Sequence, residues 1–175
     1  NWNTAQTVTV TGVNDSIDDG NVNSTTTIAI NTGSTADSIY DSVSSQTVAK
    51  TTADDDTAGF TLVQTGGSTS VAETGSTDTF TIVLNTQPTA NVVFALTDND
   101  TDNTEISYSP SALTFTTGNW NSAQTVTVTG VNDSIDDGNV NSTTTIAINT
   151  GSTEDSTYDS VSSQYVQETT DDDDT

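Results

Sequence analysis

Carboxylates are the side chains of this sequence that could do chemistry, and they occur in closely spaced groups. The 175 residues include 25 Asp and Glu against a single Lys or Arg, with a net charge of -24. Three segments with such groups follow residue 97: DNDTDNTE with Asp98, Asp100 and Asp102, VNDSIDDGN with Asp133, Asp136 and Asp137, and the terminal run with Asp172, Asp173 and Asp174. Alternate carboxylates can face one hard cation, and Ca²⁺ prefers about six to eight oxygen ligands. The spacing therefore predicts a Ca²⁺ site, although the glycine and helices of an EF-hand are missing.

The composition excludes other kinds of site. The chain has no His and no Cys, so it lacks the groups of Ser-His and Cys-His catalysis and of zinc sites. A carboxylate pair could serve a glycosidase, but short polar loops predict no cleft, and we expect no enzyme. One cationic side chain cannot neutralise phosphates, which excludes nucleic acid as a partner. No apolar run approaches the ~18 residues of a membrane span.

The elements that must position the carboxylates are predicted to be short β-strands. Apolar residues alternate with Thr in segments such as FTIVL and VVFAL, which is typical of strands with one wet face. We predict strands near residues 68–72, 78–85, 91–97, 105–116, 124–130, 143–149 and 164–169. Because Pro110 lies inside the fourth, that strand must be kinked or lie at a sheet edge. Seven strands predict an all-β, immunoglobulin-like antiparallel sandwich of two sheets.

A long internal repeat divides the chain. Residues 1–57 match residues 119–175 at all but seven positions, so the period is 118 residues, the size of a domain. The segment AGFTLV after the first acidic run reads as a new strand. We therefore expect residues 58–175 to form a complete repeat and residues 1–57 to be the C-terminal half of a preceding one.

The half-repeat has no obvious partner for its apolar face. Strands are expected near residues 6–12, 25–30 and 46–51, and half a core should not be stable alone. Three states remain open: a frayed half-repeat, one docked on a neighbouring chain, and one completed by strand exchange in a polymer.

In a sandwich whose strands alternate in direction, the loops alternate between two poles. The first, third and fifth loops and the exit of the last strand then share one pole. This pole collects Glu73, Asp98, Asp100, Asp102, Glu105, Asp133, Asp136, Asp137 and the run 171–174. Two unit charges ~4 Å apart repel by ~1 kcal/mol in water and by more at a protein surface, so this pole favours a bound cation. A reversal of the chain at Pro110 would move the fifth loop to the other pole and dissolve the site.

The order of the motifs resembles the Calx-β domain. V-x-E-x-G-S, VNDSIDDGN and the terminal acidic run follow one another within residues 58–175. Together with LTFTTGNWNSAQTVTVTGVND and a D-x-x-Y segment, they are most similar to Calx-β repeats in tandem arrays of large bacterial surface proteins. The resemblance implies Ca²⁺ ligands at Glu73, Asp98 or Asp100, Asp133 with Asp136 or Asp137, and Asp172, Asp173 and Asp174. The equivalents in the first copy are Asp15, Asp18, Asp19, Asp54, Asp55 and Asp56.

One departure affects the expected ligand set. Calcium-sensing members of the family have two Glu three residues apart in the fifth loop, where this chain has Asp136, Asp137 and Asn139. A solvated acidic surface, as in proteins from salty habitats, is the alternative interpretation of the carboxylates. Trp120 and Tyr158 are predicted to plug the core rather than to stack on a ligand, which disfavours a lectin.

These features predict a calcium-binding extender module of a large secreted or cell-surface bacterial repeat protein, an adhesin or an extracellular filament. Its partners would be neighbouring copies of the same repeat, with Ca²⁺ stiffening the junctions between them. Two alternatives remain open: a calcium-sensing interaction module, and a subunit of an extracellular polymer assembled by exchange of half-domains.

Overall fold

The computed structural model describes residues 2–99 and 105–175. These residues form two compact units. The N-terminal unit comprises residues 1–15 and 19–56, and the C-terminal unit comprises residues 16–18 and 57–175. No helix in the described part of the chain is long and apolar enough to cross a membrane.

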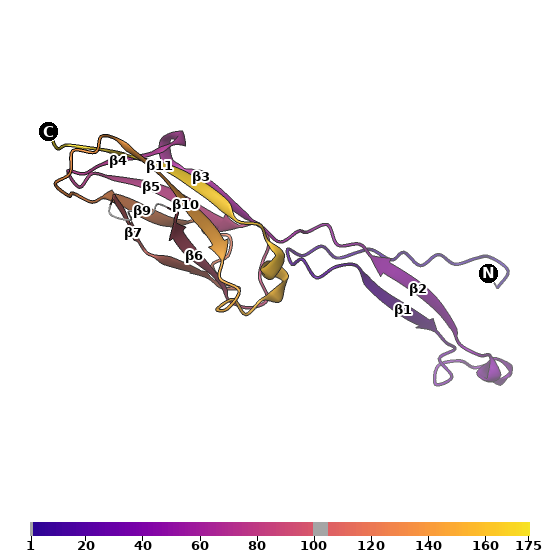
Figure 1. Ribbon diagram of the computed structural model, residues 1–175. Helices are drawn as coiled ribbons and strands as arrows, with labels where there is room; N and C mark the ends of the chain where they lie inside the picture. The colour runs from indigo at the N-terminus through magenta and orange to yellow at the C-terminus, as the bar shows by residue number, and fades with distance from the viewer. Residues whose placement is uncertain (1, 100–104) are drawn as a thin grey trace. The chain divides into compact units, whose positions relative to one another are not determined.

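The C-terminal unit consists of two β-sheets, and the all-β fold class is confirmed (Figure 1). One sheet has the order β4 (Thr69–Ala72), β11 (Gln164–Asp171), β10 (Val140–Ile148), β6 (Val92–Asp98) and β8 (Ala112–Phe115). The other has the order β3 (Phe60–Gln64), β5 (Thr77–Leu84), β9 (Gln124–Gly130) and β7 (Ile106–Ser109). All paired strands in these sheets are antiparallel except β4 and β11, which run parallel.

The prediction of seven strands is wrong for this unit, which has nine among its described residues. The segment predicted as one strand over 105–116 is divided at Pro110 into β7 and β8, which are edge strands of different sheets. The other additional strand is β3, which AGFTLV predicts correctly but which is not counted among the seven; it leads through the 3₁₀ helix η2 (Thr65–Gly67) into β4, the strand predicted over 68–72. Core-facing residues change from Ile106 and Tyr108 in β7 to Leu113 and Phe115 in β8, so the phase of the alternation shifts at the crossing, and the prediction of one strand overlooked this shift.

The core lies between the two sheets and follows the alternation of the strands. Phe80, Ile82 and Leu84 are buried on one face of β5, and Val126 and Val128 on one face of β9. Phe94 joins the sheets, since its ring meets those of Phe60 and Phe115 edge-on, with centroids 4.9 and 5.7 Å away. Such edge-to-face pairs add stability beyond the area they bury.

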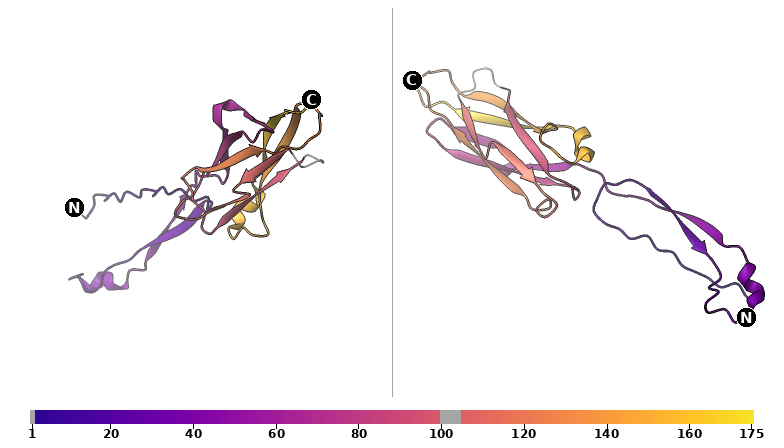
Figure 2. Two further views of the ribbon diagram at one scale, coloured as in Figure 1. Left: turned by 90° about the vertical axis from the view of Figure 1, so that its left-hand side faces the viewer. Right: turned by 90° about the horizontal axis from the view of Figure 1, so that it is seen from below.

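Strand pairing brings four strand ends to one pole. Thr144 of β10 lies opposite Asp98 at the end of β6, and Ile106 of β7 lies opposite Gly130 at the end of β9. Asp171 of β11 lies beside Ala72 at the end of β4. Because β7 and β8 run in the same direction, the loop between β9 and β10 stays at this pole, which we call the acidic pole. Figure 2 shows the C-terminus at this end of the unit and the 3₁₀ helix η3 (Ser156–Ser160) at the opposite end.

The N-terminal unit contains one hairpin, formed by β1 (Val22–Ile28) and β2 (Gln46–Thr52), and the 3₁₀ helix η1 (Ser38–Ser42). The strands expected near 25–30 and 46–51 are therefore present with shifted limits. The strand expected near residues 6–12 is not formed, although the same sequence, QTVTVTG, forms β9 in the C-terminal unit. There it pairs with β5 and β7, and β1 and β2 form a sheet of their own.

Candidate metal centre

Glu73 is the central carboxylate of the acidic pole. It directly follows β4, and its backbone N–H donates a 3.0 Å hydrogen bond to the carbonyl oxygen of Asp171. This bond continues the pairing of β4 with β11 and holds the side chain inside the pole. Only 1% of Glu73 is exposed, and neither of its carboxylate oxygens has a hydrogen-bond partner.

Four Asp side chains surround Glu73 in two groups. The first group is Glu73 with Asp137 and Asp172, and the second is Glu73 with Asp173 and Asp174. In each group one carboxylate oxygen from every member lies within 4.8 Å of the others. Residues distant in sequence therefore converge around one buried glutamate.

Local hydrogen bonds shape the loops that supply these Asp residues. One carboxylate oxygen of Asp172 accepts from the N–H of Gly138 at 2.8 Å, and the other accepts from the N–H of Asp174 at 2.8 Å. Gly138 adopts a φ of 72°, a conformation that glycine reaches without strain. Asp172 thus ties the loop after β9 to the end of the chain.

Gly130 permits the close approach of β9 to β4. A Cβ atom on this residue would lie 2.1 Å from the carbonyl oxygen of Ala72, the residue before Glu73. The N–H of Gly130 also donates to Ser76 at 3.1 Å. Only glycine lets the loop of residues 131–139 begin this near to Glu73.

Burial and repulsion by nearby carboxylates both raise the pKa of Glu73. Burial raises the pKa of its carboxyl group to about 7, helped by the negative charges of Asp172, Glu105, Asp133 and Asp137. The pKa of Asp174 is also raised, first by burial and then by Asp173, Asp172, Asp133 and Asp136. Carboxylates held in this way are stabilised by a proton or by a cation.

The residues present fit a divalent cation. Both oxygens of Glu73 and Oδ2 of Asp174 are buried without a hydrogen-bond partner, and an all-oxygen donor set suits Ca²⁺. Glu73, Asp137, Asp172, Asp173 and Asp174 are the residues that would hold it. The ion would supply the positive charge that the site lacks.

Three other predicted ligands are described by the structure but do not belong to these two groups. Asp133 and Asp136 act on the site through their charge, and Asp133 caps its own loop by accepting from the N–H of Ile135 at 2.7 Å. Asp98 lies at the end of β6, where its charge acts on Glu168. Asp100 and Asp102 lie outside the described residues.

Glu168 is a buried carboxylate that the sequence analysis did not single out. It lies on the inner face of β11 with 1% exposure, and burial followed by the charge of Asp98 raises its pKa to about 7. Thr144 approaches closely enough to oppose this rise, but neither carboxylate oxygen has a partner of good hydrogen-bond geometry. The signal was available, because alternation places Glu168 on the same face as Val166 and Thr170.

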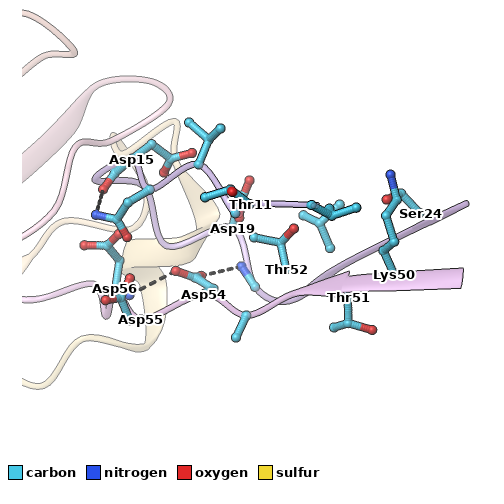
Figure 3. Close-up of a pocket in the computed structure, with 17 residues that line it drawn as sticks. Thr11, Asp15, Asp19, Ser24, Lys50, Thr51, Thr52, Asp54, Asp55 and Asp56 are labelled. Atoms are coloured by element: carbon cyan, nitrogen blue, oxygen red, sulfur yellow. Dashed lines mark hydrogen bonds between the residues drawn. The ribbon is translucent and has the colours of Figure 1, made fainter. Parts of the chain in front are cut away.

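The N-terminal unit contains the acidic run of the first copy. Asp54, Asp55 and Asp56 each offer a carboxylate oxygen within 4.8 Å of the others, and Asp15 and Asp19 line the same hollow (Figure 3). Asp54 repeats the pattern of Asp172, accepting from the N–H groups of Gly20 at 2.6 Å and Asp56 at 2.9 Å. The hydrogen bond from Asp56, followed by that from Gly20, lowers the pKa of Asp54.

This partial copy of the site lacks a central glutamate. Residues 1–57 contain no Glu, since the counterpart of Glu73 would belong to the other half of a repeat. Asp18 belongs to the C-terminal unit, where its Oδ2 accepts from the N–H of Ala58 at 2.8 Å.

The pole opposite the acidic one is structural. Asp155 caps the N-terminus of η3 and accepts from the N–H groups of Thr89 at 2.6 Å and Thr157 at 3.0 Å. Burial alone would raise the pKa of Asp155, but these hydrogen bonds outweigh it and lower the pKa. Tyr158 is buried, with its hydroxyl bonded to Thr86, and Trp120 packs against the core, so their prediction as core residues is confirmed.

Comparison with known proteins gives similarity of fold. No family model matches the chain, and no curated protein is similar to it in sequence. The crystal structure of the apo form of the Calx CBD1 domain is similar over 66% of this chain and 98% of that one, with 13% identity and a TM-score of 0.45. The E. coli chaperone DraB is similar over 66% of this chain and 57% of that one, with 8% identity and a TM-score of 0.44. The S-layer protein SbsC is similar over 72% of this chain and 14% of that one, with 22% identity and a TM-score of 0.38.

Proposed function

We propose that the C-terminal unit is a calcium-binding structural module of an extracellular repeat protein. The observation that carries the proposal is Glu73, whose two buried oxygens lack hydrogen-bond partners while carboxylates from two other segments face it. Removing a carboxylate from water is costly unless an opposite charge or a proton compensates. Ca²⁺ would provide that charge and join the ends of β4 and β11 with the loop after β9.

The position of the site within the unit supports a role at a junction between repeats. β3 and β4 run toward the acidic pole and β11 ends there, so the chain enters the unit at the opposite pole and leaves it beside the site. A repeat that followed residue 175 would begin next to the ion. Binding would remove negative charge from that junction and restrain the last residues of the chain.

The chemistry of the site favours a calcium-rich environment. Calcium sites in extracellular modules bind with Kd values of about 10⁻⁴–10⁻³ M, so even a weak site outside the cell would be filled. The resemblance to bacterial surface arrays agrees with this location. We therefore place the protein in a secreted or surface-attached assembly, with a mechanical rather than an enzymatic role.

The proposal is tested by calcium titration of chelator-treated protein, followed by calorimetry and a melting curve. An ion bound only by the folded state, at one hundred times its Kd, stabilises that state by about 2.7 kcal/mol. We expect Glu73→Gln to abolish the calcium-dependent rise in Tm. Without calcium this variant should melt at the wild-type temperature or above it, because a buried charge is removed.

Glu154→Gln provides the matched control. Glu154 is exposed in the loop between β10 and β11, at the pole opposite the site, so this variant should retain the full response to calcium. A wild-type Tm that does not change between chelator and millimolar calcium would refute the proposal.

The same titration separates an extender from a calcium sensor. A sensor would change the conformation of a folded, mobile pole and the binding of a partner. An extender would show higher stability and a longer, stiffer particle in small-angle scattering. We expect the second result, because local hydrogen bonds already shape both acidic loops.

A further inference from the structure

The hairpin of the N-terminal unit exposes side chains that are buried at the equivalent positions of the C-terminal unit. Ile28 is 57% exposed and Val48 47%, whereas their counterparts Ile146 and Val166 are fully buried. Trp2, Val8, Val10 and Tyr40 are also exposed in the N-terminal unit. An apolar surface of this kind marks an interaction site.

The internal repeat identifies what covers this surface. In the C-terminal unit, residues 119–175 supply β9, β10 and β11, and residues 58–118 supply every other strand. Strand β6 pairs with one edge of the β10–β11 hairpin, and β4 pairs with the other. The β1–β2 hairpin has the same register as β10–β11, but among the described residues no further strand pairs with either of its edges.

The hollow of the N-terminal unit contains a positive charge, that of Lys50, which is complementary to an acidic half-repeat. Ser24 and Lys50 line it (Figure 3), and they are partners in the β1–β2 register. The counterpart of Lys50 is Glu168. The negative charge of Asp98 disfavours the ionised form of Glu168. A half-repeat that carried the counterpart of Asp98 would place this carboxylate beside Lys50, the sole cationic side chain of the chain.

Exchange between copies of the chain cannot supply the occupant for every molecule. Each chain has one segment of the type 58–118 and two segments of the type 119–175. Every exchange therefore leaves one C-terminal half per chain uncovered. A further segment of the 58–118 type would cover the remaining half.

We propose that the β1–β2 face is the docking surface for an N-terminal half-repeat similar to residues 58–118, joined ahead of residue 1. Docking adds strands to both edges of the hairpin and turns residues 6–12 into a strand. It also covers the apolar face and pairs Lys50 with an aspartate. This inference does not depend on calcium, and its test is run both with chelator and with calcium.

The test joins a copy of residues 58–118 directly to residue 1 of the full chain. All compared chains carry Trp120→Phe, which leaves Trp2 as the sole tryptophan, because the added segment contains none. We expect the emission of Trp2 to shift to shorter wavelength and its quenching by acrylamide to fall several-fold. Backbone amides of residues 6–12 should become as protected from hydrogen exchange as those of residues 124–130.

The matched control has the same length but cannot form the added core. In it, Phe80→Asp and Phe94→Asp are introduced only in the added copy, and Trp2 should remain accessible. Lys50→Glu in the extended chain, which recreates the residue of the other repeat, should lower the Tm of the completed repeat. An unchanged Tm would refute the pairing of Lys50 with an aspartate.

Two outcomes would overturn the proposal itself. In the first, Trp2 stays accessible and residues 6–12 exchange freely in the extended chain. In the second, Trp2 of the unextended chain becomes buried as concentration rises, with dimers seen by light scattering. The occupant would then be a second copy of the chain.

Discussion

At the scale of single residues, the main feature is a pair of buried glutamates with different neighbours. Glu73 lies among aspartates at the acidic pole, where a cation can be shared. Glu168 lies on the inner face of β11, near Asp98 and Thr144. Both pKa values are raised to about 7, but among the described residues only Glu73 of the two belongs to a group of carboxylates that could hold a metal.

Calcium binding should weaken as the pH falls through about 7, because a proton on Glu73 competes with the ion. Isothermal titration calorimetry at pH 8, 7 and 6 should show falling affinity and increasing proton release from Glu73. The exposed-site variant Glu154→Gln should follow the wild type. An affinity that stays constant from pH 8 to pH 6 would contradict this role of Glu73.

Without calcium, stability should fall as the pH rises toward 7. The pKa of Glu168 is raised from 4.5 to about 7 in the folded state. Its proton therefore favours folding below pH 4.5, and this contribution is lost as the pH rises through 7. One such group changes the free energy of unfolding by at most ~1.4 kcal/mol per pH unit.

The variant Glu168→Gln isolates this contribution. It keeps the shape of the side chain but cannot titrate, so its stability in chelator should fall less steeply between pH 5 and pH 7. Urea unfolding at each pH measures the difference, with Glu154→Gln as the control. Equal slopes for wild type and Glu168→Gln would mean that Glu168 does not hold its proton in the folded state.

At the scale of elements, the structure contains the same glycine in two settings. A Cβ on Gly130 would lie 2.1 Å from the carbonyl oxygen of Ala72, whereas a Cβ on its counterpart Gly12 would meet Thr52 at an ordinary 3.5 Å. The first contact is with backbone and requires β9 and β4 to move apart. The second needs no change.

Gly130→Ala should therefore destabilise the C-terminal unit and weaken calcium binding, while Gly12→Ala should do neither. A clash of this kind with backbone costs about 1–3 kcal/mol. Chemical denaturation and calcium titration of the two variants give the comparison. A similar loss of stability in both would show that the approach of β9 to β4 is not what requires glycine.

At the scale of the whole molecule, salt could stabilise this negatively charged chain in two ways, by screening the charges or by binding of an ion. The net charge is -24, and 0.1 M salt screens charges separated by more than about 10 Å. The groups around Glu73 lie within 4.8 Å of one another, so monovalent salt cannot screen them effectively. A proton on Glu73 or an ion in direct contact would reduce their repulsion.

Millimolar CaCl₂ should consequently raise the Tm more than NaCl of equal ionic strength. A stabilisation of about 2.7 kcal/mol corresponds to roughly 10 °C for a domain of this size. MgCl₂ should be less effective, because Mg²⁺ demands a smaller, stricter octahedral site. Differential scanning calorimetry checks this order, and equal shifts with all three salts would indicate a solvated acidic surface.

The repeat shows which parts of the fold were predictable from sequence. The β1–β2 and β10–β11 hairpins share one register, equivalent aspartates cap η1 and η3, and Asp54 and Asp172 make the same hydrogen bonds. These features form in both copies because their contacts come from the segment itself. The strand count was predicted wrongly, because AGFTLV was not counted among the seven strands and the shift of alternation between Tyr108 and Leu113 was overlooked.

The sequence by itself determined the all-β class, the hairpins and the turns that gather aspartates. Only tertiary structure decided whether QTVTVTG becomes a strand, and whether a valine within it is buried, as Val128 is, or exposed, as Val10 is. Tertiary structure likewise decided that Glu73 meets Asp137 and Asp172. The physical reason is that a strand needs hydrogen-bond partners and a carboxylate cluster needs neighbours, and both come from distant segments of a chain.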